Sequence, residues 1–502
     1  MALASIRKLL PCLILAAILG YQLFIPPPVG LANNGDFGKV ISIFSLGTPP
    51  GDEYTFTRLK YRFGPEFHWK SGFYSTEMLL TWVAIGLNNI FSKEGSFDLR
   101  WMGLIHGLLF LFAAYLLQDL LAGWDRWRRF LLWAAIVSCF GDVMYVSYFN
   151  SFYMDAAAYI FLMLALVLFL RAVAWRRRSD AIGLVVCVTL MLLAKSQHAI
   201  LGLWIAPLFA FFGGDLWRGN GRLFAIVSTA IVASAALLST QASPFDYAAK
   251  GYYTVIFKQV LPNSRNVRAD LLMLGLDDSY EKLIGTHAYS AESGMNDTAF
   301  ERVFMERTSY SRLGWYFLSH PRSAYLAART SLEEGGRQRA PMGNFDRSAG
   351  LPESTESQAF AFWSNAKRTF FHGRGVRYLN CFLLMALLIC TIATGRRRTL
   401  PRTLVAGVYA IAGMGMTEML VAALADAVDV TRHYFIAASI LDLELLILFV
   451  LLTGILRPPE EDARKLNYGF HSEAAQQQEL GQIVRCEQTH QVSTFLHQRT
   501  AA

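Results

Sequence analysis

Short polar motifs interrupt a very hydrophobic chain at positions 33–36, 148–155, 195–198 and 429–433. They contain the carboxylates, lysine, arginine and histidines on which acid–base chemistry and phosphate binding depend. Ionisable groups beside lipid are costly unless they face a cavity or a partner. Because the chain repeatedly places such groups near the ends of apolar runs, we expect the motifs to form one shared site.

The first motif offers a candidate general base, Asp36. The Asn34-Gly35 pair favours a tight turn that would hold the following carboxylate projecting from its loop. Such a carboxylate can accept the proton of an attacking hydroxyl opposite a departing phosphate, as an inverting sugar transfer requires. The alternative is a structural cap at the turn. Asp52 and Glu53 form an adjacent acidic pair and are the runner-up base or metal ligands.

Basic side chains of two later motifs are candidates for binding a donor phosphate. Lys195 and His198 are three residues apart and would share one face of a continued helix. Arg432 and His433 are adjacent, and the planar fork of an arginine suits the charge that develops on a phosphate leaving group. The alternatives are a lysine that extends to lipid headgroups and a structural salt-bridge cluster with neighbouring acids.

Aromatic, amide and acidic residues of the motifs predict a sugar-binding platform. Aromatic faces cover the apolar side of a pyranose, while Asn and Asp side chains bind its hydroxyls. An interfacial aromatic belt explains the motif at 148–155 equally well. The expected sugar and acceptor contacts are Asn33, Asn34, Tyr148, Asn150, Tyr153, Asp155 and Asp429.

The elements that must position these residues are membrane spans. The chain is 54% hydrophobic and only 17% charged over 502 residues, which is too apolar for a soluble protein. The predicted fold class is an all-α polytopic membrane protein with about ten transmembrane helices. The apolar runs are 9–24, 101–122, 130–147, 156–173, 181–194, 199–213, 223–240, 378–394, 404–425 and 434–456.

Basic clusters set the predicted orientation. Arginines within 126–129, 176–178 and 396–398 occupy alternate junctions between the runs, and the positive-inside rule places these junctions and both termini in the cytoplasm. The net charge of +8 is therefore a topology signal, and no nucleic-acid partner is expected. All the polar motifs then lie on the outer face. The run 78–91 breaks the alternation and is interpreted as an interfacial or re-entrant helix.

The chain accordingly divides into six predicted parts. The domain at 241–377 shows helical patterns at 270–283 and 300–330, and a polar stretch at 335–357 predicts a loop over the site. The parts are a first transmembrane helix (1–25), a first outer loop with the interfacial helix (26–100), a transmembrane bundle (101–240), a small, mostly helical extracytoplasmic domain (241–377), C-terminal transmembrane helices (378–456) and a cytoplasmic tail (457–502).

Two other classes of protein are disfavoured by motifs that the sequence lacks. Five of the six cysteines lie inside apolar runs, so neither a disulfide framework nor a zinc motif is present. No Gly-rich phosphate loop occurs, which argues against a soluble nucleotide-binding domain.

A resemblance to a known family adds to this interpretation. The order of the parts resembles the multi-span, lipid-linked sugar transferases of the GT-C fold, which use polyprenyl-phosphate sugars. More narrowly, segments 33–39, 148–153, 195–198 and 431–433 resemble bacterial hexosyltransferase-like membrane proteins of surface-layer (S-layer) and cell-surface glycan biosynthesis. The chain has Lys39 where that group is expected to have arginine, and a lysine loses bidentate phosphate binding.

The resemblance implies a glycosyltransferase of a bacterial inner (plasma) membrane that moves a hexose from a polyprenyl-phosphate donor to a cell-surface glycan acceptor. The resemblance also implies roles for residues of this chain. Asp36 would be the base, and four basic residues would surround the donor phosphate, namely Lys195, His198, Arg432 and His433. No metal ligands are assigned, because lysine and arginine can neutralise the phosphate, although a divalent cation is compatible with the acidic pairs.

Acidic residues inside the apolar runs support a different function. Glu418, Asp442 and Glu444 lie within spans, where ionisable groups are costly and often functional. They favour a lipid-linked glycan flippase or transporter as the alternative to an enzyme. These acids are also explained as neutral, hydrogen-bonded carboxyl groups that hold helices together. A non-catalytic assembly protein is a third candidate function.

Overall fold

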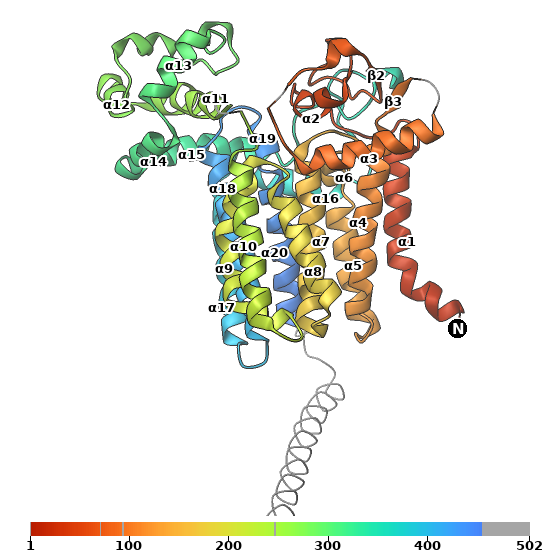
Figure 1. Cartoon of the computed structure of the whole chain (residues 1–502). Helices are drawn as coiled ribbons and strands as arrows, with labels where there is room; N and C mark the ends of the chain where they lie inside the picture. Colours follow the sequence, from red (N-terminus) through yellow and green to blue (C-terminus); the bar gives the residue numbers. More distant parts are fainter. Residues whose placement is uncertain (1, 71, 93–94, 245–246, 454–502) are drawn as a thin grey trace, which may run out of the picture. The chain divides into compact units, whose positions relative to one another are not determined.

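The computed structural model describes residues 2–70, 72–92, 95–244 and 247–453 (Figure 1). Met1–Leu452 form one compact unit. The tail predicted at 457–502 lies outside the described residues.

A bundle of membrane-length helices confirms the predicted all-α polytopic class. Among the described residues, seven helices are long and apolar enough to cross a membrane, and shorter helices accompany them in the bundle (Figure 1). The seven are α4 (Arg100–Leu120), α7 (Met154–Trp175), the helical segment Ser196–Leu216 that contains α9 (Gly202–Phe212), α10 (Gly221–Thr240), α17 (Gly375–Gly395), α18 (Arg402–Leu424) and α20 (Phe435–Thr453). The shorter or less apolar helices are α1 (Ala2–Phe24), α5 (Arg126–Phe140) and α8 (Arg178–Leu192).

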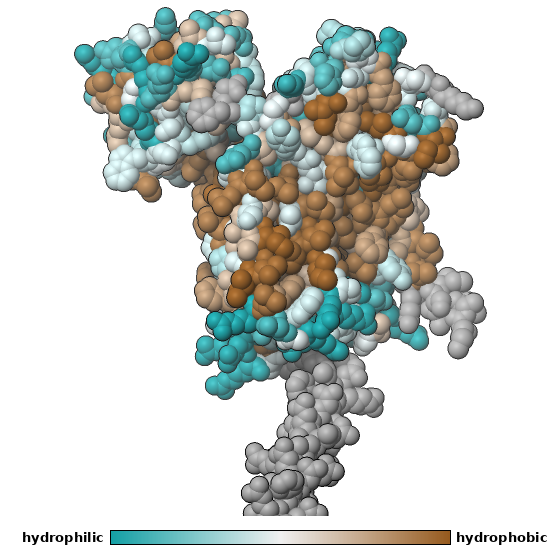
Figure 2. Space-filling model, viewed as in Figure 1, coloured by the Kyte–Doolittle hydropathy of each residue, from teal (hydrophilic) through white to brown (hydrophobic). Residues whose placement is uncertain are grey.

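Burial differs between the helices in a way that identifies the centre of the bundle. The most apolar stretch of α7 is 83% buried, whereas that of α10 is 28% buried. A helix that is apolar on all sides belongs in a core, and α7 packs against α4 and α8. Figure 2 shows an apolar band on the visible face of the bundle, bounded below by a hydrophilic edge. The α4–α5, α7–α8 and α17–α18 junctions, which carry the arginine clusters, lie at that lower end (Figure 1).

Residues 26–100, called the first outer segment after their predicted location, contain a small antiparallel sheet that the sequence did not predict. Strands β1 (Leu46–Gly47), β2 (Lys60–Phe63) and β3 (Ser96–Asp98) pair in the order β1-β2-β3. Strands of two to four residues are too short for the alternation of apolar and polar residues to be recognised. Short helices complete the segment, namely α2 (Gly38–Ile41), η1 (Ser42–Phe44) and η2 (Pro65–Phe67).

Helix α3 (Thr76–Phe91) corresponds to the apolar run that broke the predicted alternation. It begins after Ser75, whose side chain accepts a hydrogen bond from the Glu77 backbone N–H. In Figure 1, α3 lies across the upper ends of the bundle helices instead of running parallel to them, and it packs against α4 and α7. This orientation agrees with the interfacial interpretation.

The second outer segment folds into several short helices around a core of its own, which includes Phe257, Phe304 and Tyr316. The pattern predicted at 270–283 is broken at Gly275, whose φ is +84° and where a Cβ would lie 2.2 Å from the Arg307 carbonyl oxygen. The elements are α11 (Tyr247–Thr254), η5 (Val255–Val260), η6 (Leu261–Asn263), α12 (Val267–Met273), η7 (Asp278–Leu283), η8 (Ala291–Ser293), α13 (Thr298–Arg307), α14 (Tyr310–Ser319), α15 (Pro321–Gly335), η9 (Arg347–Ala349) and α16 (Phe362–Phe371).

The predicted loop at 335–357 is fastened to the first outer segment by backbone hydrogen bonds. Gly30 and Ala32 N–H groups donate to the Asn344 and Gly343 carbonyls, both at 2.9 Å. Gly343 N–H donates to the Tyr54 carbonyl at 2.9 Å, and a Cβ on Gly343 would lie 1.9 Å from the Thr55 carbonyl oxygen. The loop is therefore part of the scaffold behind the first motif.

Asp442, which the sequence offered as evidence for transport, is surrounded by hydrogen-bond donors of the same chain. Its Oδ2 accepts hydrogen bonds from Lys367 at 2.7 Å, Trp363 Nε1 at 2.8 Å and the Tyr145 hydroxyl at 2.5 Å. Lys367 and Trp363 belong to α16, so this buried carboxylate joins α16 to α20. Three converging donors compensate the cost of burying the acid.

Replacing Lys367 by methionine is expected to lower the free energy of unfolding by about 3 kcal/mol, because it leaves a buried carboxylate without its cation. Denaturation by SDS in mixed micelles measures the change. The double variant Lys367→Met/Asp442→Asn should recover most of the loss. Arg368→Met is the matched control, since its partly exposed pair with Glu356 contributes at most about 1 kcal/mol. Equal losses in the two single variants would contradict the assignment.

Candidate active site

A tight turn after α1 presents the Asp36 carboxylate, as the sequence predicted. The Asn33 side-chain oxygen accepts hydrogen bonds from the backbone N–H groups of Gly35 at 2.9 Å and Phe37 at 3.1 Å. The Asn34 side-chain oxygen accepts from the Asp36 N–H at 3.1 Å. Gly35 has a φ of +99°, a conformation that glycine adopts without strain. These bonds use the two asparagines to shape the loop.

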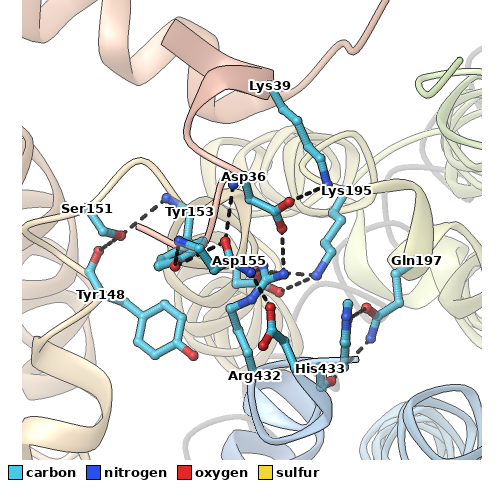
Figure 3. A network of polar contacts seen from close by, with 12 residues as sticks. Asp36, Lys39, Tyr148, Ser151, Tyr153, Asp155, Lys195, Gln197, Arg432 and His433 are labelled. Atoms are coloured by element: carbon cyan, nitrogen blue, oxygen red, sulfur yellow. Dashed lines mark hydrogen bonds and ion pairs between the residues drawn. The ribbon is translucent and has the colours of Figure 1, made fainter. Parts of the chain in front are cut away.

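The Asp36 carboxylate is held by a cation at each oxygen (Figure 3). Oδ1 lies 2.5 Å from Lys39 Nζ, and Oδ2 lies 2.5 Å from Arg432 Nη2. Burial alone would raise the pKa of Asp36, but the nearby charges of Arg432 and Lys39 outweigh it and hold this pKa well below its usual value. The carboxylate is therefore ionised throughout the neutral range.

Arg432 is the centre of the cluster. It belongs to α19 (Val430–His433), which follows Asp429 at a φ of +51°. Its Nη1 lies 3.5 Å from Asp155 Oδ2, and its guanidinium carbon lies 4.8 Å from the centre of the Tyr153 ring. Burial lowers the pKa of Arg432, but Asp36 and Asp155 outweigh burial and raise it well above its usual value. Arg432 thus joins the first outer segment to the start of α7.

Lys195 and Asp155 form the second ion pair of the cluster. Lys195 Nζ lies 2.9 Å and 3.3 Å from the two oxygens of Asp155, which stands in the first turn of α7. Both side chains are buried. Burial lowers the pKa of Lys195 against the opposing effect of Asp155. The structure thus brings Asp36, Asp155, Lys195 and Arg432 together from four distant parts of the sequence.

The two histidines belong to a hydrogen-bonded chain beside the ion pairs. His198 Nδ1 lies 2.6 Å from Glu418 Oε1, and its Nε2 lies 3.9 Å from Asp155 Oδ1. Gln197 donates to Glu418 Oε2 at 2.9 Å and lies 3.1 Å from His433 Nδ1 through its own oxygen. Glu418 therefore supports the motif at 195–198 from α18, which explains a buried acid in that span without transport.

Asp429 and Tyr153 tie the first motif to the rest of the site. Asn34 Nδ2 donates to Asp429 Oδ2 at 2.6 Å, and the Tyr54 hydroxyl donates to the same oxygen at 3.2 Å. The Tyr153 hydroxyl donates to the Ala32 carbonyl at 2.7 Å and accepts from the Asn34 N–H at 3.1 Å. These contacts fix the turn that carries Asp36.

Two predicted sugar contacts lie among structural residues. The buried Asn150 amide donates to the Leu23 and Val29 carbonyls at 3.1 Å and 2.8 Å, so it holds the end of α1. The buried Tyr148 ring stacks on Phe435 at 3.9 Å. Their contacts within the chain explain both residues without a sugar.

The runner-up acids lie outside the cluster. Asp52 pairs with Arg58 at 3.0 Å and with Arg347, and these arginines hold the pKa of Asp52 below its usual value. Glu53 is exposed and accepts a hydrogen bond from the Gly51 N–H. Neither acid contacts the basic motifs through any bond described for this chain, so Asp36 is the better-placed candidate base.

Lys39 is a site residue whose role the sequence interpretation missed. Its spacing of three residues from Asp36 places both on one side of a helical turn, and this spacing was the signal that could have identified the pair. The contact of Lys39 with the Tyr247 hydroxyl, which accepts its hydrogen bond, depends on tertiary structure and had no such signal.

The described residues offer no candidate metal site. Across the described ranges, no group of three or more His, Cys, Asp or Glu side chains is arranged to hold an ion. The carboxylates Asp36 and Asp155 instead face Lys39, Lys195 and Arg432. An anion is the ligand that such a set of cations favours.

A bundle of membrane-length helices with an acid–cation cluster at one end defines a multi-span membrane protein. The chain belongs to the family described as the YfdI N-terminal transmembrane domain, whose model matches residues 2–469. This is a GT-C-like glycosyltransferase family. No curated protein and no solved structure matches the chain.

Proposed function

We propose that this protein transfers a hexose from a polyprenyl-phosphate donor to a hydroxyl of a cell-surface glycan, on the outer face of a bacterial inner membrane and with inversion. The observation that carries the proposal is the contact between Asp36 and Arg432 across 396 positions of sequence. This contact supports the proposal because a carboxylate that can act as a base lies beside a cation that suits a leaving phosphate. Lys195 and His198 adjoin the same pair through Asp155.

The proposed reaction is a single displacement at the anomeric carbon. Asp36 accepts the proton of the acceptor hydroxyl while that oxygen forms a bond to the anomeric carbon. The bond from this carbon to the phosphate oxygen breaks, and the lipid phosphate leaves with the electron pair. Arg432 and Lys195 stabilise the charge that grows on the phosphate. The proton ends on Asp36 and is later released to water.

An assay with purified protein in nanodiscs tests the proposal directly. A panel of polyprenyl-phosphate hexoses is supplied with glycan acceptors, and the configuration of the product is determined by NMR. The expected product has the opposite anomeric configuration to the donor. Cells that lack the protein should also accumulate the unmodified glycan, which mass analysis of surface glycans detects. A product with retained configuration would exclude the single displacement.

Glu444 is the observation that favours the second candidate, a lipid-linked glycan flippase or transporter. This acid of α20 is fully buried, and neither carboxylate oxygen has a hydrogen-bond partner among the described residues. Transport of a fluorescent lipid-linked sugar across liposomes, lost in Glu444→Gln and retained in Asp36→Asn, would support transport. The opposite pattern in the transfer assay would support the enzyme.

The proposal requires the site to face outward, and cysteine labelling measures this. In a variant without native cysteines, Ser311→Cys of α14 is expected to react with a membrane-impermeant maleimide on spheroplasts. Arg397→Cys at the α17–α18 junction is expected to react only after permeabilisation, because basic junctions face the cytoplasm. Both positions are exposed in the structure, so access to the reagent depends on the leaflet. Labelling of both from outside would refute the predicted orientation.

A further inference from the structure

Lys39 lies between Asp36, the proposed base, and Tyr247 of the second outer segment. Its Nζ donates to the Tyr247 hydroxyl at 2.7 Å and lies 4.2 Å from the centre of that ring. The Phe73 ring is 5.2 Å away. Ring faces within about 6 Å attract an ammonium group. The Tyr247 hydroxyl and the two rings therefore give Lys39 contacts besides the one with Asp36.

The two ion pairs of Asp36 oppose its use as a general base. Both of its oxygens contact cations, Oδ1 at Lys39 and Oδ2 at Arg432. A general base must offer an oxygen to the incoming hydroxyl, and it works best with a pKa near the working pH. Because Lys39 and Arg432 hold the pKa of Asp36 well below its usual value, the carboxylate becomes a stronger base when one of these two contacts is lost.

Of the two cations, Lys39 is the one that is able to move. Arg432 is 4% exposed and is fixed by Asp155 as well as by Asp36. Lys39 is 13% exposed, and its partner Asp36 is 17% exposed, so this pair forms the open side of the cluster. In Figure 3, Lys39 comes from the first outer segment, and Arg432 comes from a helix on the opposite side of Asp36. A flexible four-carbon stem allows the ammonium to turn.

We propose that Lys39 is a ligand of the donor phosphate and that its ammonium moves from Asp36 to that phosphate when the donor binds. The move leaves Asp36 Oδ1 open to the acceptor hydroxyl. The base is thus weak in the empty site and becomes effective only when a donor is in place. This inference rests on the proposed function, since it assigns the lysine to the same lipid-phosphate donor.

Binding of a simple probe tests the move without any reaction. The probe is methyl farnesyl phosphate, a phosphodiester whose single negative charge does not change between about pH 4 and about pH 7. If binding removes Lys39 from Asp36, the pKa of Asp36 is higher in the complex, and proton binding and probe binding favour each other. The affinity is therefore expected to rise threefold or more as pH falls over this range, since each unit of pKa change corresponds to about tenfold.

Variants of the two residues should change the binding in opposite directions. Asp36→Asn releases both cations, so it is expected to bind the probe several times more tightly than the parent and with a smaller rise at low pH. Lys39→Met is expected to bind about tenfold more weakly, since it loses a charge-assisted contact, and to show a smaller rise at low pH. Lys70→Met, an exposed lysine of the same outer segment, is the matched control and should bind as the parent does.

Kinetic pH profiles provide the second measurement. The acid limb of kcat/KM reports the free enzyme, and that of kcat reports the donor complex. In the parent and in Lys39→Arg, the acid limb of kcat is expected at a higher pH than the acid limb of kcat/KM. In Lys39→Met the two limbs should lie at the same pH. Parent-like probe binding by Lys39→Met, or no gain of affinity in Asp36→Asn, would overturn the inference. Absence of transfer from every donor would instead refute the proposed function, while the binding results would still decide the role of Lys39.

Discussion

Replacing Asp36 by asparagine is expected to lower kcat for hexose transfer by about a thousandfold, the contribution of a positioned general base. Asparagine keeps the size of the side chain and its acceptance of hydrogen bonds, but it cannot take the proton of the acceptor hydroxyl. The Michaelis constant for the donor should fall at the same time, because Lys39 and Arg432 no longer have a carboxylate to bind. Initial rates over a range of donor concentrations separate the two effects.

Two further variants make the assignment of the base specific. Asp277→Asn is the matched control, because this exposed acid pairs with Arg307 in the second outer segment and should leave kcat unchanged. Asp52→Asn tests the runner-up base of the first outer segment. Loss of transfer in Asp52→Asn with full transfer in Asp36→Asn would reverse the assignment. Membrane levels of each variant show whether the protein is made and inserted.

The sequence predicted the membrane bundle well because long apolar runs and arginine clusters act locally. The run 156–173 corresponds to α7 (Met154–Trp175), and the break of the alternation at 78–91 corresponds to α3. Both features depend on hydrophobicity and charge within a short window, and such windows can be recognised without knowledge of the fold. The sheet in the first outer segment escaped recognition because its strands are too short to show a period.

The site was predictable in its residue types but not in all of its pairings. The motif residues Asp36, Lys195 and Arg432 meet as expected, because each motif stands at the same end of the bundle. The structure gives Asn150 contacts that the sequence did not predict, since its amide bonds to backbone carbonyls from the end of α1 and the residues after it, and its sugar contact stays a prediction. An exposed sugar-binding amide and a buried structural amide have the same sequence signal. Only the tertiary contacts tell them apart.

The roles of two buried acids also could not be assigned from the sequence alone. Glu418 and Asp442 looked alike as ionisable groups within apolar spans. In the structure Glu418 supports His198 and Gln197 at the site, whereas Asp442 binds Lys367 and holds α16 in the bundle. Their partners come from 75 to 297 positions away in the sequence. No local pattern could have assigned these two roles.

Replacing Arg432 by lysine is expected to lower kcat by about a hundredfold while the protein remains folded. The positive charge is kept, so Asp36 and Asp155 do not become unpaired buried carboxylates. The planar fork is lost, however, and a single ammonium cannot contact both carboxylates and the leaving phosphate in the way that a guanidinium does. Removal of one donor from a site of developing negative charge costs about 10²–10³ in rate.

The division between kcat and KM identifies what Arg432 does. A residue that stabilises the phosphate only as it leaves should change kcat and kcat/KM equally, whereas one that merely holds the donor should raise KM alone. Arg307→Lys is the matched control, because this arginine forms a similar but exposed pair with Asp277. A rise in KM with an unchanged kcat in Arg432→Lys would assign the arginine to donor binding. The stabilisation of the leaving phosphate would then fall to Lys195 and Lys39, the remaining cations of the cluster.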